Sequence, residues 1–289
     1  MAQCGQHEAQ AAPAKHTWRE CIEAWRSDAQ IQHNLVNSTK TSYRRMMDAL
    51  LEKNAGKDMS KTTRQVVRAA INAIAAETPR KATKYAQTIS LLWNYAVTEL
   101  DWPLGLNSAK KLGSHKPARE FEPWPDWMVR QLDSAPERVQ IAARLILGTG
   151  QRPNAAITMQ QDQFHGETMT VRDEKGKQEI EVYCPKSLRE FVGELPRRGK
   201  YILAKNLTEP MGYNPVEKAF RTCRDTMGEP AKPFSLHGLR KLAIIELAEA
   251  GASDAEIQAV TGQSAEMVAY YRKRANKLTL SKAAIKRME

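Results

Sequence analysis

The sequence predicts a mainly α-helical protein with one small β-hairpin, an α+β arrangement spread over two domains. Three features indicate this fold class. Apolar residues recur at helical spacing from Thr17 to about Leu100, a Pro- and Gly-rich stretch follows from 102 to about 125, and apolar and polar residues alternate at 169–183. With 289 residues, 42% of them hydrophobic, the chain can build two cores of ordinary size.

The first predicted domain covers residues 15–108 and follows a flexible leader at 1–14. One of its helices has an apolar face with i, i+3, i+4, i+7, i+8 spacing, formed by Tyr43, Met46, Met47, Leu50 and Leu51. Three cations lie off this face, namely Lys40, Arg44 and Arg45. This helix is therefore predicted to have an apolar side and a basic side.

Two further helices are predicted in this domain. Ser60 can cap the first of them, and the second runs from Pro79, near its first turn, to Leu100. Cations crowd the start of the second helix, namely Arg80, Lys81 and Lys84. A helix dipole disfavours cations at this end unless an anion is nearby, so these residues indicate either phosphate contact or a solvated helix end.

Residues 109–125 are predicted to be a basic interdomain linker. Gly113 and three prolines, at 117, 123 and 125, exclude a long helix here. Lys110 and Lys111 stand at the beginning of this stretch.

The second predicted domain covers residues 126–289. It should begin with a helix at 127–147 and contain a hairpin at 169–183, with Gly176 in the turn. Ser253 and Glu256 have the spacing of a capping box in front of another helix. A short amphipathic tail helix should follow Tyr271, and it can pack on its own domain or on a neighbouring protomer.

The composition favours a polyanionic partner. A net charge of +11 and a pI near 9.5 are typical of nucleic-acid binding, with a merely solvated basic surface as the plainer alternative. No stretch is long and apolar enough to cross a bilayer, and residues 1–15 lack the apolar core of a signal peptide. We therefore expect a cytoplasmic protein that associates with the nucleoid and has no membrane partner.

The cysteines and histidines predict no metal site. No CxxC pair is present, and no cysteine and histidine have the spacing of metal ligands. The cysteines are expected to be free thiols in a reducing compartment: Cys4, Cys21, Cys184 and Cys223. We expect no cofactor.

The segment 235–240, which reads SLHGLR, is the first candidate for a reactive site. His237 and Arg240 are three residues apart, immediately before an apolar helical run, so on a helix they share a face. An imidazole and a guanidinium aimed at one point suit a phosphodiester under attack. Earlier in the chain, Arg152 follows an apolar helix and a Gly-marked turn, where it can donate two parallel hydrogen bonds to a phosphate.

The order of these residues resembles the tyrosine recombinase, or phage integrase, family over nearly the whole chain. The matching segments read TGQRPNAA, RDEKGKQEIEVYCP, LHGLRKLAI and VTGQSAEMVAYYRKRANK. The positions that match the family's site are, in chain order, Arg152, Lys175, His237, Arg240, Gln263 and Tyr271. The resemblance implies a core-binding first domain and a catalytic second domain that form a C-shaped clamp on DNA.

The resemblance also implies a role for each residue. Arg152 and Arg240 would hold the non-bridging phosphate oxygens, and Lys175 on the hairpin would protonate the departing 5′ oxygen. His237 would accept the tyrosine proton or hydrogen-bond the phosphate. The oxygen of Tyr271 would form a 3′-phosphotyrosyl bond, which conserves the energy of the broken phosphodiester and needs neither metal nor ATP.

The sequence departs from the family pattern at three points. Gln263 replaces the usual histidine and can only hydrogen-bond, and Ala155 replaces a frequent acidic residue. The step from Gln263 to Tyr271 is eight residues instead of nine, which leaves Tyr270 open as an alternative nucleophile. Lys177, two residues after Lys175, stays open as an alternative general acid.

We therefore expect a site-specific DNA recombinase that acts through a Holliday junction, as a homotetramer on double-stranded attachment sites. A directionality factor or bending protein can assist it. The cations expected to bind DNA are Lys40, Arg44, Arg45, Arg80, Lys81, Lys84, Lys110 and Lys111. Gln263 favours the integrase of a mobile element over a chromosome-dimer resolvase. An enzyme like a type IB topoisomerase and a DNA-binding accessory protein with a degenerate site are also compatible with these residues.

Overall fold

The computed structural model describes residues 15–112, 121–172, 179–275 and 277–286. The chain divides into two compact units, residues 1–120 and 121–289, and each is described by itself. Both are mainly helical, and the second also contains a small antiparallel sheet, so the predicted fold class is confirmed. Among the described residues, no helix is long and apolar enough to cross a membrane.

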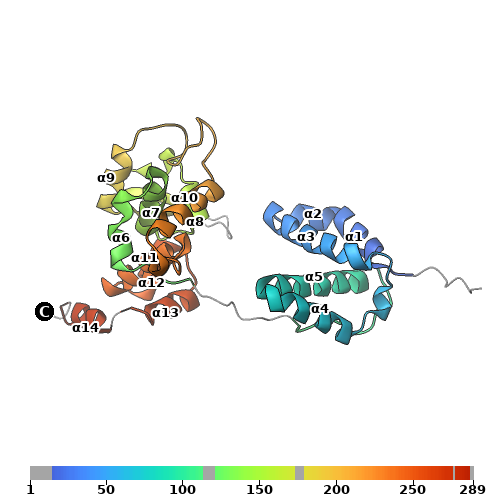
Figure 1. Cartoon of the computed structure of the whole chain (residues 1–289). Coiled ribbons are helices and arrows are strands. Elements are labelled where there is room, and N and C mark those ends of the chain that lie inside the picture. Colours follow the sequence, from blue (N-terminus) through green and yellow to red (C-terminus); the bar gives the residue numbers. More distant parts are fainter. Residues whose placement is uncertain (1–14, 113–120, 173–178, 276, 287–289) are drawn as a thin grey trace, which may run out of the picture. The chain divides into compact units, whose positions relative to one another are not determined.

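The first unit is a bundle of helices around one core (Figure 1). The helices are α1 (Trp18–Ser27), α2 (Ala29–Asn34), α3 (Asn37–Asn54), α4 (Arg64–Glu77) and α5 (Pro79–Thr98). Helix α5 has the longest buried face, because Ala82, Ala86, Ile89, Trp93 and Ala96 recur every three or four residues. Its predicted boundaries agree with the structure to within two residues.

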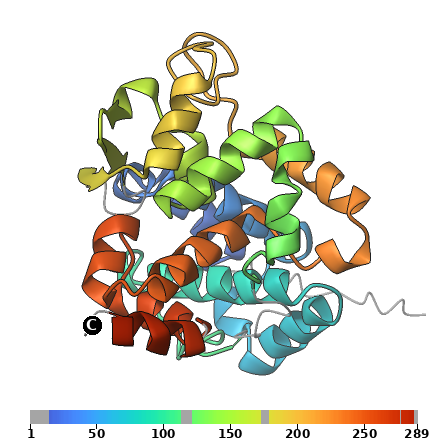
Figure 2. The same cartoon turned by 90° about the vertical axis from the view of Figure 1, so that its left-hand side faces the viewer.

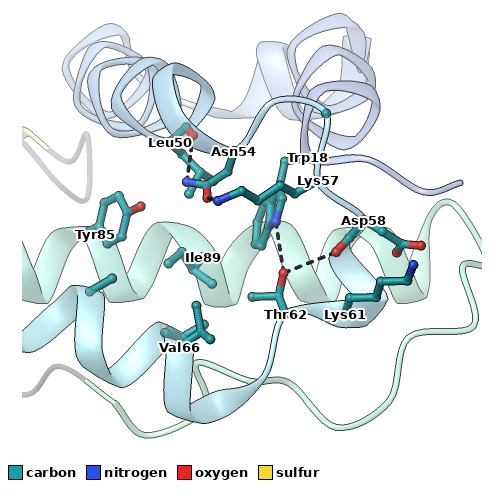
Figure 3. Close-up of a pocket in the computed structure, with 13 residues that line it drawn as sticks. Trp18, Leu50, Asn54, Lys57, Asp58, Lys61, Thr62, Val66, Tyr85 and Ile89 are labelled. Atoms are coloured by element: carbon teal, nitrogen blue, oxygen red, sulfur yellow. Dashed lines mark hydrogen bonds between the residues drawn. The ribbon is translucent and has the colours of Figure 1, made fainter. Parts of the chain in front are cut away.

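The predicted cap of α4 is wrong. Thr63, not Ser60, is the N-cap, and its Oγ1 accepts a hydrogen bond from the backbone N–H of Val66 at 3.4 Å. Ser60 lies in a short 3₁₀ turn, Met59–Lys61, where its N–H and hydroxyl both donate to Asp58 Oδ1. The neighbouring Thr62 accepts a hydrogen bond from the indole of Trp18 at 3.2 Å (Figure 3), so the chain must pass Thr62 in an extended form before the helix can begin.

The residues after α5 fold back on the first core. Trp93 Nε1 donates to the carbonyl of Gly105 at 3.1 Å, and Ala109 is buried in this core. At the other end of the predicted linker, Trp124 is buried in the core of the second unit. The stretch of chain between the two cores is therefore shorter than the predicted linker at 109–125.

The second unit is built around helix α11 (Leu236–Glu249), as Figure 1 shows from one side and Figure 2 from another. Buried residues occur on all sides of α11, which is typical of a central helix. The elements that contact it are α7 (Glu137–Thr149), α8 (Pro153–Ile157), α12 (Asp254–Thr261), α13 (Ala265–Arg272) and α14 (Lys277–Lys286). The remaining helices of this unit are α6 (Asp126–Arg130), α9 (Lys186–Glu194) and α10 (Tyr213–Thr226).

The single helix predicted at 127–147 is in fact interrupted. Helix α6 ends at Arg130, a 3₁₀ turn follows at Leu132–Ser134, and α7 begins only after Pro136. Proline has no N–H to donate and clashes with the preceding turn, so a continuous helix cannot pass through this position.

The predicted hairpin is confirmed as β2 (Thr168–Arg172) paired with β3 (Glu179–Tyr183), with Val171 opposite Ile180. A two-residue strand, β1 (Phe164–His165), extends the sheet and was not predicted, because two residues carry no detectable alternation. The turn at 173–178 lies outside the described residues, and with it both lysine candidates, Lys175 and Lys177.

The C-terminal helices form a third cluster with one end of α11. The capping box of Ser253 and Glu256 at the start of α12 is confirmed. Ile257 of α12, Val268 of α13 and Leu280 of α14 pack with α11 residues in this cluster. In this structure the tail helix thus packs on its own domain, the first of the two arrangements that the sequence allows.

Two adjacent valines on α4 provide a matched test of the first core. Val67 is 3% exposed and Val66 is 60% exposed. Val67→Ala should lower the free energy of unfolding by about 1.5–3 kcal/mol, because it removes buried methyl groups and leaves a cavity. Val66→Ala should change it by less than about 0.5 kcal/mol. Urea unfolding of both variants measures this, and equal losses would contradict the assigned orientation of α4.

Candidate active site

The start of α11 is held by a segment from the beginning of the second unit. Trp124 Nε1 donates to the carbonyl of Ser235 at 2.7 Å, and Glu122 forms an isolated backbone bridge with Phe234. The approach is so close that a Cβ atom on Gly238 would lie 2.2 Å from the carbonyl oxygen of Glu122. Glycine between His237 and Arg240 is therefore a packing requirement of this crossing.

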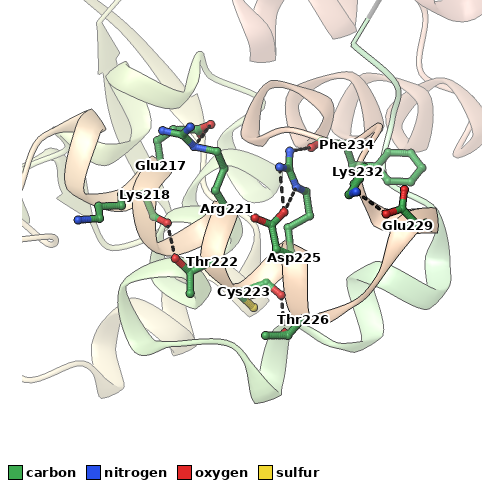
Figure 4. A network of polar contacts seen from close by, with 11 residues as sticks. Glu217, Lys218, Arg221, Thr222, Cys223, Asp225, Thr226, Glu229, Lys232 and Phe234 are labelled. Carbon is green, nitrogen blue, oxygen red and sulfur yellow. Dashed lines mark hydrogen bonds and ion pairs between the residues drawn. The ribbon is translucent and has the colours of Figure 1, made fainter.

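A polar network fixes the segment that leads into α11 from the other side (Figure 4). The guanidinium of Arg224, at the end of α10, donates to the carbonyl of Phe234 and to Asp225 Oδ1, both at 3.1 Å. Lys232 pairs with Glu229 in the connecting turn. These contacts hold the residues directly before His237.

His237 is half-buried near the N-terminus of α11, with its ring 4.9 Å from the ring of Phe121. Burial, and then the positive charges of Arg240, Lys241 and Arg152, lowers the pKa of His237 to about 4. The imidazole is therefore neutral near pH 7, and it can accept a proton. Arg240 and Lys241 follow His237 on α11 by three and four residues, and the charge of Arg152 acts on the same ring.

Arg240 is only 3% exposed and is held by the end of α12. Its Nη2 donates to the carbonyl of Thr261 at 3.3 Å. The amide of Gln263 is assigned with its oxygen toward the guanidinium, because only this orientation is complementary; Oε1 then accepts from Nε at 2.9 Å and from Nη2 at 3.2 Å. Two of the predicted site residues, Arg240 and Gln263, are thus in direct contact.

Arg152 is positioned by the turn between α7 and α8. Helix α7 ends at Gly150 in the left-handed conformation (φ 61°), and a Cβ atom there would lie 2.8 Å from Thr261 Cγ2. The buried side chain of Gln151 donates to the carbonyl of Val260 at 3.3 Å. This turn therefore packs on the end of α12, and Arg152, the N-cap of α8, follows it.

The two candidate tyrosines lie on α13 in different environments. Tyr271 is 5% exposed within the third cluster, and Tyr270 is 39% exposed. Their rings are 5.2 Å apart in an edge-on arrangement. Both face Lys241 of α11, whose Nζ lies 5.2 Å from the ring centroid of Tyr271 and 5.9 Å from that of Tyr270.

Two ion pairs fix the chain that follows Tyr271. Arg272 pairs with Asp254 at the start of α12 at 2.6 Å, and Arg274 pairs with Glu122 at 2.7 Å. The second pair joins residues 152 positions apart and ties the end of α13 to the segment that crosses α11. Both pairs hold the tyrosines against their own domain.

Sequence reasoning missed several residues that this arrangement uses. They are Phe121, Glu122, Gln151, Lys241 and Arg274. A lysine after Arg240 has no local pattern that separates it from a solvated lysine. The contacts of Glu122 and Gln151 join distant parts of the chain, so no local spacing reveals them. Among the described residues, no group of three or more histidines, cysteines or carboxylates could hold a metal ion.

The cations assigned to DNA binding fall into two groups on the first unit. The ammonium of Lys84 lies 4.0 Å from the ring centroid of Tyr43, which places the start of α5 beside α3. The first group therefore includes Lys40, Arg44, Arg45, Arg80, Lys81 and Lys84, with Lys40 and Lys84 partly buried. The second group is Lys110 and Lys111. It lies at the N-terminal end of α4, where Arg64 donates to the carbonyl of Lys110 at 2.7 Å, whereas the start of α5 follows the C-terminal end of α4.

The family comparison covers the second unit. The sequence model of the phage integrase family matches residues 127–277, a span that includes every predicted catalytic residue. No curated protein matches the chain.

Solved structures match both units. A lambda integrase tetramer bound to a Holliday junction has a TM-score of 0.76 at 20% identity, over 89% of this chain and 77% of the other. A lambda integrase fragment, as a dimer bound to a COC′ core site, has a TM-score of 0.71 at 18% identity, over 88% and 94%. A fragment of the Tn1549 transposon integrase with circular intermediate DNA has a TM-score of 0.68 at 13% identity, over 95% and 100%. At these identities the likeness shows the fold.

Gly238→Ala tests the crossing over α11. The added methyl group would clash with the carbonyl of Glu122, so the segment must move, and we expect a loss of about 1–3 kcal/mol in the free energy of unfolding. Gly193→Ala is the matched control, since nothing lies within 4 Å of its added Cβ on α9. It should be neutral or stabilising by up to about 1 kcal/mol. Urea unfolding compares them, and similar results for both would be inconsistent with the crossing.

The shifted His237 gives a pH prediction. Its pKa is about 4 in the folded protein against 6.5 in an unfolded chain, so between these values the unfolded chain binds a proton that the folded one does not. The free energy of unfolding should therefore decrease as the pH falls from about 6.5 to about 4. Unfolding measured across this range should show a weaker decrease for His237→Asn. Parallel curves for the two proteins would refute the low pKa.

Proposed function

Because the chain belongs to the phage integrase family, we propose that it is a site-specific DNA recombinase that breaks and rejoins strands through a covalent phosphotyrosyl intermediate. The observation that carries this proposal is that the end of α12 holds both the side chain of Arg240 and the turn before Arg152, beside a neutral His237 on α11. The same helix, α11, contacts the tyrosines on α13 through Lys241.

The proposed reaction starts with the tyrosine hydroxyl, and Tyr271 is our first candidate. Its oxygen attacks the phosphorus atom, its proton passes to His237, and the bond to the 5′ oxygen breaks. Arg152 and Arg240 stabilise the charge that develops on the non-bridging oxygens. Lys175 protonates the departing 5′ oxygen, and rejoining reverses these steps.

The low pKa of His237 supports the assignment of the proton acceptor. A histidine that is already protonated cannot take up the tyrosine proton, and burial among three cations keeps this one neutral. Gln263 does not titrate. With its oxygen toward Arg240, its NH₂ group is left as a donor for the phosphate.

The choice between the tyrosines rests on their environments. Tyr271 packs closer to Lys241, but it is nearly fully buried, so attack requires α13 to shift toward the DNA. Tyr270 is already exposed and stays the alternative nucleophile. Because Tyr270 and Tyr271 are adjacent on α13, only one of their hydroxyl groups can lie in line with the scissile bond for a given position of the helix.

The proposed substrate is duplex DNA that carries attachment sites, bound in part by the two cation groups of the first unit. We propose assembly as a homotetramer and passage through a Holliday junction, and membership of the family supports both. A lambda integrase tetramer has been solved on such a junction. We favour integration or excision of a mobile element, assisted by a bending protein or directionality factor. The proposed location is the cytoplasm, in association with the nucleoid.

One specific observation favours a second candidate function. Gln263 stands where the family has a histidine, which is also compatible with a DNA-binding accessory protein that cannot cleave. An enzyme resembling a type IB topoisomerase and a chromosome-dimer resolvase use the same site chemistry, so the DNA substrate must separate them.

Cleavage can be tested with nicked suicide substrates made from the sequences that flank the coding region. The wild-type protein should form a covalent adduct that resists denaturing electrophoresis, since the nick lets the short 5′-hydroxyl fragment diffuse away. Tyr271→Phe should abolish the adduct, and Tyr270→Phe, its matched control, should retain it. His237→Ala should reduce the rate more than Gln263→Ala, because only the imidazole accepts a proton.

Each different result has a definite meaning. No adduct from the wild type on any of these substrates would support the accessory protein. Loss of the adduct in Tyr270→Phe alone would make Tyr270 the nucleophile. Relaxation of supercoiled plasmid without an attachment site would support the topoisomerase-like enzyme.

A further inference from the structure

A buried lysine has no role in the reaction described above. Lys241 follows Arg240 on α11 and is 5% exposed. Withdrawing an ammonium group from water is costly unless the surroundings stabilise its charge. Its neighbours include the ring faces of Tyr271 and Tyr270, at 5.2 and 5.9 Å from Nζ. A ring face attracts a cation, so these contacts account for part of its stabilisation.

Lys241 also belongs to the surroundings of His237. The two residues are four positions apart on one helix and therefore share a face. The ammonium of Lys241 is one of the charges that keep His237 neutral. In the proposed reaction, the charge of Lys241 thus acts on Tyr271, which releases a proton, and on His237, which receives it.

Other charged groups on the elements around Tyr271 make contacts of their own or are exposed. On α13 and the residues after it, Arg272 pairs with Asp254 and Arg274 pairs with Glu122. On α12, the carboxylate of Glu256 accepts the capping hydrogen bond of Ser253. Glu266, in the first turn of α13, is exposed.

The charged groups of α11 complete the surroundings. Arg240 donates to Thr261 and Gln263. Glu246 and Glu249 lie further along the helix than Lys241, by about 7.5 and 12 Å of helix rise. Among the described contacts, the cation that lies against the ring of Tyr271 is therefore Lys241.

We propose that Lys241 is a positioning residue that holds the ring of Tyr271 and favours its phenolate form for attack. This inference rests on the proposed function, in which Tyr271 is the nucleophile. The hydroxyl proton goes to neutral His237, and the ammonium offsets the negative charge left on the oxygen. Once α13 has shifted, that oxygen bonds to phosphorus as the 5′ oxygen leaves. Lys241 keeps its own proton throughout and does not contact the phosphate.

The test measures ionisation of Tyr271 in the whole protein without DNA. Protein labelled with ¹³C at the tyrosine ring is titrated by NMR, and Tyr271→Phe identifies the resonance. Lys241→Met, which keeps the length of the side chain but not the charge, should move the titration midpoint of Tyr271 upward by about one to two pH units. Lys241→Arg should keep it within about half a unit of the wild type. Lys186→Met, at an exposed position of α9, is the matched control and should have no effect.

An unchanged midpoint in Lys241→Met would overturn the proposal. Should that variant not fold, Lys241→Gln takes its place as the uncharged variant. Because burial raises the midpoint of a tyrosine and a nearby cation lowers it, only the difference between the charged and the uncharged side chain at 241 isolates the effect of the cation.

Adduct formation on a nicked suicide substrate separates this inference from the proposed function. If the wild type forms the adduct, Lys241→Met should show the same upward displacement in its pH–rate profile and regain most of the wild-type rate at high pH. A loss of rate that is equal at every pH would indicate a merely structural lysine and refute the inference, while leaving the recombinase intact. Absence of any wild-type adduct refutes the proposed function, and the NMR titration still decides the effect of Lys241.

Discussion

The C-terminal end of α12 is the point on which the site depends. Its last carbonyls accept hydrogen bonds from two other parts of the chain, Val260 from Gln151 and Thr261 from Arg240. Gln263, just beyond the helix, accepts from Arg240 again. The negative end of the α12 dipole and two oxygen acceptors thus stabilise the buried guanidinium of Arg240. A third acceptor, the carbonyl of Val260, binds the turn that carries Arg152. Without this end of α12, the side chain of Arg240 and the turn before Arg152 would lose the acceptors that orient them.

The site concentrates positive charge in a small volume. The charges of Arg240, Lys241 and Arg152 all act on one imidazole, and their mutual repulsion opposes folding. The structure limits this repulsion in two ways, by keeping His237 neutral and by having an amide at position 263. A protonated histidine at 263 would add a cation beside Arg240, whereas the Gln263 oxygen accepts from it. The departure from the family pattern is therefore consistent with a functional anion site, because binding of a phosphate would relieve the remaining repulsion.

The elements that could be predicted are those whose signal is local. The long apolar face of α5, the alternation around Val171 and the Ser253 capping box all depend on residues a few positions apart. Order along the chain also indicated the arginines and His237. The cap of α4 was misplaced because Asp58 and Trp18 compete for the residues around Ser60. Lys241, and the reason for a glycine at 238, could not be predicted, since each depends on a segment brought close by the tertiary fold.

Because Tyr271 and Val268 are buried in the third cluster, α13 must leave apolar contacts before the tyrosine can attack, whereas the ion pairs after it oppose this movement only weakly. The ion pairs that anchor the chain after the tyrosine, Arg272–Asp254 and Arg274–Glu122, have side chains between 31% and 48% exposed. Pairs this exposed contribute about 0–1 kcal/mol each. A phosphate held by Arg152 and Arg240 would gain charge-assisted hydrogen bonds of about 1.5–3 kcal/mol each, in a site that already carries excess positive charge. The hydrogen bonds of a bound phosphate therefore exceed the two ion pairs, and in the proposed reaction they help to offset the apolar contacts of Val268 and Tyr271 that are lost when α13 shifts.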